Sequence, residues 1–296
     1  MKLLNDIKNG FKRTKFFLKY ITFMYAVTFI FSFFGGLAFN LSLNPVKNRP
    51  ILNTLFEKFN FSIYNSFMHN YGDGIDVLMT SMFLFAVMFV LIEIFFSSAL
   101  LGTIFDNSTK NKISRFFSRG VKFYWRFFKL FIYFLIAVVV AFAAIVTITA
   151  AIISSYEGSG IESDYFYTTL IAILIFILAF IKLSIIADVA KLFIVKENIK
   201  NVWFAVKKSF LFLLLRMHVF FFFYFIIIFI VSAVAGIYLL IETNIITTNM
   251  FAVFVLFIIQ QLIIWVKYAS KVLLIALEYE YFNLNFVDLK TKDVKK

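Results

Sequence analysis

Six long apolar runs, separated by polar segments, are the dominant pattern along this chain. The runs cover approximately residues 16–39, 77–105, 127–153, 165–195, 213–241 and 248–276. Each run exceeds the roughly 20 residues that a helix needs to cross the hydrocarbon core of a bilayer. The runs are continuously apolar and lack the alternation typical of barrel strands, which favours helices. The pattern therefore predicts an all-α fold, an integral membrane bundle of six transmembrane helices.

The apolar runs and the polar segments before them form a pattern that occurs three times. We interpret the chain as a single membrane domain, 1–296, built from repeat units at residues 1–110, 111–197 and 198–285, with a polar tail at 286–296. Each unit begins with a basic, aromatic, amphipathic segment and continues as an outward span and a return span. We therefore expect three repeated hairpins, each preceded by an amphipathic helix at the cytoplasmic surface.

Basic residues are concentrated in alternate polar segments. All but four of the 29 Lys and Arg residues lie in the N-terminal segment, the second and fourth connections, or the C-terminal end, and the exceptions are Lys47, Arg49, Lys58 and Lys182. Cytoplasmic segments of membrane proteins carry an excess of Lys and Arg. The distribution predicts a multi-pass protein of the cytoplasmic (inner) membrane of a bacterium, with both termini in the cytoplasm.

The net charge of +13 changes the prediction of partners. Such a charge could indicate nucleic-acid binding, but here the basic residues flank membrane spans, where each gains about 1 kcal/mol beside anionic lipids. We therefore expect contacts with anionic headgroups on the cytoplasmic side, leave a partner membrane protein open, and expect no nucleic acid. The candidate lipid contacts are Lys12, Arg13, Arg119, Lys122, Lys207 and Lys208.

A few polar residues lie at membrane depth, where charges are costly and often functional. Glu93 is near the middle of the second run, Lys182 is in the inner half of the fourth, and Gln260 and Gln261 lie at a comparable depth in the sixth. One interpretation is a polar cluster facing the interior of the bundle, with Glu93 and Lys182 paired. The other is that Lys182 extends toward the interface while Glu93 is neutral or hydrogen-bonded to a neighbouring helix.

The sequence lacks the common catalytic signatures. It contains no cysteine and only two histidines, so it offers no thiolate ligands and no paired-histidine metal motif. It also lacks a phosphate-binding glycine loop and a nucleophile-elbow motif. We therefore expect no enzymatic activity, no cofactor and no bound metal.

Two stretches carry a family resemblance. The first is Ala187–Lys191 followed by Trp203–Phe210, and the second is SALLGTIF…FFSRGVKFYWRFFKL from Ser98. They resemble sequences of poorly characterised bacterial six-span proteins, which are similar to the membrane portion of some glycerophosphodiester phosphodiesterases. The resemblance implies a membrane module and no activity, because no catalytic residue of the phosphodiesterase domain carries over.

Two classes of function remain open from the sequence. The first is a non-enzymatic multi-pass membrane module that engages lipids or partner membrane proteins. The alternative is a small-solute or lipid transporter. Spans without proline favour the first, because many transporters bind substrate at interrupted helices. A Glu93–Lys182 pair lining a cavity would favour the second.

Overall fold

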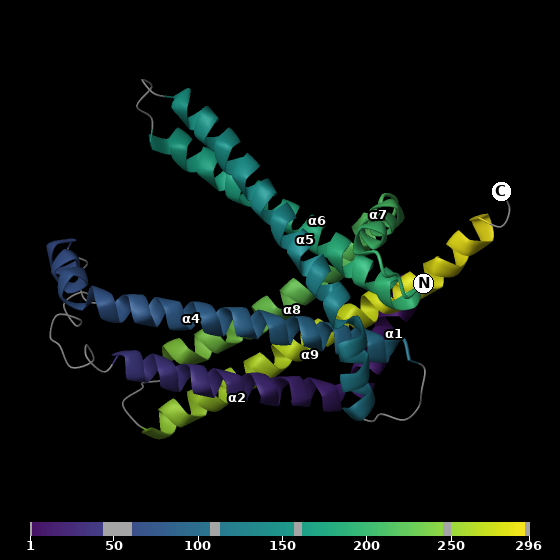
Figure 1. Cartoon of the computed structure of the whole chain (residues 1–296), viewed down its shortest axis with the longest axis horizontal. Coiled ribbons are helices and arrows are strands. Elements are labelled where there is room, and N and C mark those ends of the chain that lie inside the picture. Colours follow the sequence, from purple (N-terminus) through teal and green to yellow (C-terminus); the bar gives the residue numbers. More distant parts are fainter. Residues whose placement is uncertain (1, 44–60, 107–112, 157–161, 245–249, 294–296) are drawn as a thin grey trace. The chain divides into compact units, whose positions relative to one another are not determined.

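The described part of the chain is entirely helical outside its turns and connections. The computed structural model describes residues 2–43, 61–106, 113–156, 162–244 and 250–293. Its helices are α1 (Lys2–Phe16), α2 (Leu18–Leu43), α4 (Phe61–Ile104), α5 (Ile113–Ser154), α6 (Glu162–Lys196), α7 (Val202–Leu213), α8 (Met217–Asn244) and α9 (Met250–Asp293) (Figure 1). The predicted all-α class is confirmed.

Six of the described helices, α2, α4, α5, α6, α8 and α9, are long and apolar enough to cross a membrane. Their apolar side chains are largely uncovered by protein: none of the most apolar window of α5 is buried, and only 6% of that of α6. Contiguous apolar surface of this extent is rare on soluble monomers. Lipid is the solvent that suits it, and the chain is a multi-pass membrane protein.

The chain divides into two compact units, one of which comprises residues Thr22–Glu93. In this unit α2 packs against the first part of α4 through aromatic rings. The ring of Phe31 lies 5.3 Å from that of Phe85 and 6.4 Å from that of Phe89, centroid to centroid. These contacts make α2 and α4 the first hairpin.

The other unit comprises Met1–Ile21 and Ile94–Lys296 and contains two further hairpins. Helices α5 and α6 run side by side (Figure 1), with the rings of Phe134 and Phe180 5.7 Å apart. Helices α8 and α9 form the third hairpin, α1 packs on α9, and α7 packs on α6. The three predicted hairpins are therefore present.

The core of this second unit is aromatic and joins α6, α7, α8 and α9. The ring of Phe282 lies 4.9 Å from that of Phe193 and 5.4 Å from that of Phe212. The ring of Phe220 lies 5.6 Å from that of Tyr281. Edge-to-face pairs of this kind add to the free energy gained by burial. The core lies at the helix ends predicted to face the cytoplasm.

Several helix boundaries differ from the predicted ones. The second amphipathic segment is continuous with its span in α5, whereas the first and third end at breaks before α2 and α8. Helix α4 begins at Phe61, well before the apolar run at 77, and α9 continues to Asp293, into the predicted tail. The ends of an apolar run are set by contact with lipid, whereas the ends of a helix are set by backbone hydrogen bonds. The ends of a run and of its helix therefore need not coincide.

Candidate functional site: a basic pocket at the end of α4

Helices α4 and α5 approach closely near the C-terminal end of α4. A Cβ atom at Gly102 of α4 would lie 2.8 Å from the Cβ of Arg119, and one at Gly120 of α5 would lie 2.7 Å from the ring of Phe95. The hydroxyl of Ser98 also donates to the carbonyl of Gly120 at 2.9 Å. Because glycine has no side chain, these contacts bring the basic face of α5 against the last turn of α4.

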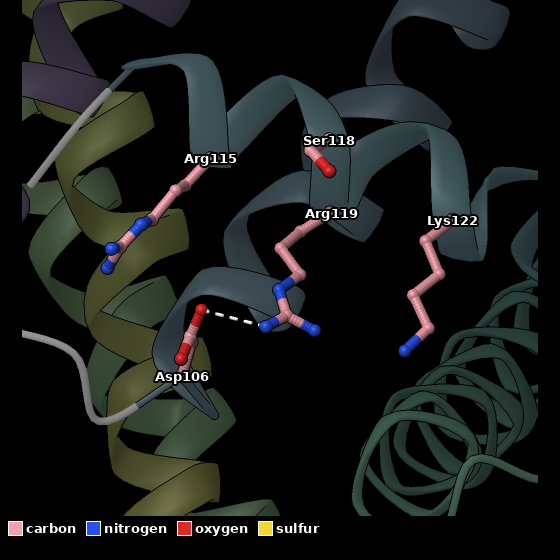
Figure 2. A pocket seen from close by; sticks show the side chains of 5 residues that line it. All are labelled: Asp106, Arg115, Ser118, Arg119 and Lys122. Carbon is pink, nitrogen blue, oxygen red and sulfur yellow. Dashed lines mark hydrogen bonds and ion pairs between the residues drawn. The ribbon is translucent and has the colours of Figure 1, made fainter.

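A pocket of about 400 Å³ opens beside this contact. Figure 2 shows its lining side chains, which are Asp106, Arg115, Ser118, Arg119 and Lys122. The three basic residues are spaced i, i+4 and i+7, so they lie on one face of α5. Asp106 follows α4, and its Oδ2 accepts a hydrogen bond from Nη2 of Arg119 at 2.9 Å.

A second pocket, of about 380 Å³, adjoins the first and shares Asp106, Arg119 and Lys122 with it. It adds Lys196 from the end of α6, whose Nζ donates to Oδ1 of Asn283 at 2.7 Å. Asn198 lines the same pocket. Its φ of 52° lies in the left-handed region, which asparagine tolerates, and its Oδ1 accepts from Arg126 at 2.8 Å. Helices α4, α5, α6 and α9 thus all contribute to the combined pocket.

The lining of the combined pocket is strongly cationic. Arg115, Arg119, Lys122 and Lys196 supply four positive charges, and Asp106 is the only carboxylate among the described lining residues. Guanidinium groups bind phosphate and carboxylate with paired hydrogen bonds, and ammonium groups add point charges. The arrangement suits an anion, and above all one with several acceptor oxygens.

The six predicted lipid-contact residues fall in different places. Arg119 and Lys122 both line the pocket. Arg13 forms an ion pair with Glu280 at 2.6 Å, and Lys208 one with Glu197 at 2.5 Å. The other two lie elsewhere on the surface: Lys12 of α1 is exposed, and the ammonium of Lys207 lies 5.7 Å from the centre of the Trp203 ring.

Sequence reasoning missed two cations of the site, Arg115 and Lys196. A signal for Arg115 was available, because it shares the helical face of Arg119 and Lys122. Lys196 has no such signal. Lys196 reaches the pocket because α6 ends beside the end of α4. There the ammonium of Lys196 lies 5.7 Å from the centre of the Phe105 ring.

The polar residues predicted at membrane depth are distributed over several helices. Gln260 donates from Nε2 to the hydroxyl of Tyr238 at 2.6 Å, which links α9 to α8. Lys182 is exposed on α6, and Gln261 is partly buried on α9. Glu93 is the last residue of one compact unit and Lys182 lies in the other, so their pairing stays a prediction.

Comparisons of the chain with models of protein families, with curated proteins and with solved structures found no match. Among the described residues, no group of three or more His, Asp and Glu side chains could hold a metal ion. The function is therefore inferred from the basic pocket.

Proposed function

We propose that this protein is a non-enzymatic membrane module whose basic pocket holds the phosphate-bearing headgroup of an anionic lipid. We place it in the cytoplasmic membrane of a bacterium, with both termini in the cytoplasm. The observation that carries the proposal is the convergence of Arg115, Arg119, Lys122 and Lys196 around a single carboxylate, Asp106. The resemblance to six-span proteins is consistent with the same class of module.

The surroundings of the pocket suit an amphiphile better than a soluble anion. Val121 and Trp125 on α5, beside Lys122, are 71% and 61% exposed. An indole at this position is typical of the interface between headgroups and acyl chains. A lipid could therefore place its phosphate among the cations and its chains along the apolar surface of α5.

The carboxylate of Asp106 competes with such a ligand, because it already pairs with the guanidinium of Arg119. The side chains of Arg119 and Asp106 are 35% and 27% exposed, and pairs of this kind contribute only about 0–1 kcal/mol. A phosphate can therefore replace Asp106 as the partner of the Arg119 guanidinium with little loss of free energy. Removal of the Asp106 charge should strengthen anion binding, whereas removal of the pocket cations should weaken it.

The proposal is tested with purified full-length protein in a neutral detergent. Thermal unfolding is followed while short-chain phosphatidic acid, phosphatidylglycerol or phosphatidylcholine is added, with inorganic phosphate as the soluble arm. We expect the anionic lipids to stabilise the protein more than phosphatidylcholine. The double variant Arg115→Gln/Lys122→Gln should bind them roughly thirtyfold more weakly, from about 1 kcal/mol for each of the two lost cations. Asp106→Asn should bind them more tightly.

A matched control loses the same charge outside the pocket. Lys129→Gln/Lys267→Gln removes two exposed lysines that are not among the described lining residues. It should retain the affinity of the wild type. Equal weakening in both double variants would show a nonspecific charge effect and overturn the assignment of the pocket. Stabilisation by inorganic phosphate alone, without a further gain from lipid, would point to a soluble ligand instead.

A further inference from the structure

A second polar cluster lies where α6, α8 and α9 meet, apart from the basic pocket. Glu278 of α9 is only 1% exposed, and its Oε1 has no hydrogen-bond partner among the described residues. It lies within electrostatic range of Asp188 and Lys191 on α6 and of Tyr224 on α8. Burial of a carboxylate with an unpaired oxygen is costly, so this group needs an explanation.

The two carboxyl groups of the cluster have different surroundings. Both oxygens of Asp188 accept hydrogen bonds: Oδ1 from the ammonium of Lys191 at 2.6 Å, and Oδ2 from the hydroxyl of Tyr224 at 2.5 Å. Both oxygens of Asp188 therefore have hydrogen-bond donors, and Lys191 is its ion-pair partner. Glu278 receives neither donor in this arrangement, so a negative charge on it would have no cation of its own.

We propose that Glu278 is a buried proton-binding site of this protein, and that its proton holds α9 against α6 and α8. A proton is the cation that fits here, because it needs no additional coordinating oxygens and makes the cluster neutral. Loss of the proton would place a second negative charge beside Asp188, with Lys191 as the shared counter-ion. Release of the proton would thus loosen the packing of the α8–α9 hairpin on α6, and binding of the proton would tighten it.

The contacts that α1 and the end of α4 make with α9 involve the neighbours of Glu278. Helix α1 approaches the neighbouring Leu277 closely at Gly10, and its Arg13 pairs with Glu280. The end of α4 contacts Tyr279, whose ring lies 4.7 Å from that of Phe105. The charges that act most on Glu278 are those of Asp188 and Lys191, and Glu278 in turn acts on Tyr224 of α8.

Infrared spectroscopy of the full-length protein in nanodiscs tests the proposal, because only a protonated carboxyl group shows the carboxylic-acid C=O stretch. We expect the wild type at neutral pH to show such a band and Glu278→Gln to lose it. Glu280→Gln is the matched control, two residues away, with a 16% exposed side chain that is paired with Arg13. It should retain the band. Equal carboxylic-acid absorption in the wild type and Glu278→Gln would overturn the proposal.

The pH dependence of thermal stability gives a second readout. A native state that holds one more proton than the unfolded state loses stability as the pH rises. The unfolding equilibrium of the wild type should shift toward unfolding by up to about tenfold per pH unit, and the curve of Glu278→Gln should be flatter. Glu278→Met, of similar volume, serves if the glutamine variant does not fold. A sodium-dependent stability that needs Glu278, without the infrared band, would identify an alkali cation instead and overturn the proposal.

Discussion

At the scale of single residues, two positions without a side chain shape the basic pocket. Gly102 and Gly120 lie on facing surfaces of α4 and α5, and each would place an added Cβ atom closer than 3 Å to a neighbouring side-chain atom. The Cβ of Arg119 cannot rotate away from Gly102, because it is fixed by the backbone of α5. The distance between these helices, and with it the position of the Arg119 guanidinium, therefore depends on glycine.

We predict that Gly102→Ala destabilises the protein by about 1–3 kcal/mol, the usual cost of overpacking. The added methyl would lie 2.8 Å from the Cβ of Arg119 and 3.3 Å from the ring of Phe123. Thermal unfolding in detergent measures the effect. Gly236→Ala is the control, because nothing lies within 4 Å of its added methyl and alanine favours the helix. Equal melting temperatures for the two variants would contradict the close approach of α4 and α5.

At the scale of secondary-structure elements, the amphipathic segments differ in how they join their spans. The third forms a separate helix, α7, which ends at the turn of residues 214–216 and has Asn201 as its N-cap. The Oδ1 of Asn201 accepts from the backbone N–H of Trp203 at 3.1 Å and, more weakly, from that of Phe204 at 3.5 Å. Val202 and Ala205 of the first turn are buried, so the cap also orients the apolar face of α7.

Asn201→Ala should therefore weaken the first turn of α7. Loss of a capping side chain costs about 1 kcal/mol, which corresponds to roughly fivefold faster hydrogen exchange of the amides that open with this turn. Asn201→Asp keeps the acceptor oxygen and should exchange as the wild type does. Hydrogen exchange followed by mass spectrometry gives the local readout. Unchanged exchange in Asn201→Ala would mean that packing on α6 alone holds α7.

At the scale of the whole molecule, the distribution of basic residues predicts the orientation of the protein in the membrane. Cytoplasmic excess of Lys and Arg sets topology because positive residues are retained on that side during insertion. The basic pocket, the amphipathic segments and the aromatic core all lie at the helix ends that carry this excess. The orientation therefore also determines which leaflet supplies the lipid.

Cysteine labelling tests the orientation, since the chain contains no cysteine of its own. Lys207, in the middle of α7, and Glu242, in the last turn of α8, are both exposed, and they are predicted to lie inside and outside respectively. We expect an impermeant maleimide to label Glu242→Cys in intact cells, whereas Lys207→Cys should react only after the membrane is opened. The reverse pattern would invert the topology and place the basic pocket in the outer leaflet.

The sequence by itself determined the helical class, the six spans and the preference for a basic surface. These properties follow from local composition: the transfer of apolar side chains into lipid adds up along a run, and the backbone of that run must be helical to satisfy its own hydrogen bonds. The same local patterns made Arg119 and Lys122 candidate lipid contacts. The helical spacing of Arg115 could have added it to these candidates.

Only the tertiary structure decided which polar groups meet. Lys196 joins Arg119 because α6 ends beside α4, and Glu278 meets Asp188 across two helices that are far apart in the chain. Gln260 pairs with Tyr238 for the same reason. Such pairings depend on the rotation and separation of packed helices, which small residues such as Gly102 set and which no local pattern encodes. The membrane class could therefore be read from the sequence, whereas the two polar sites required the packed helices.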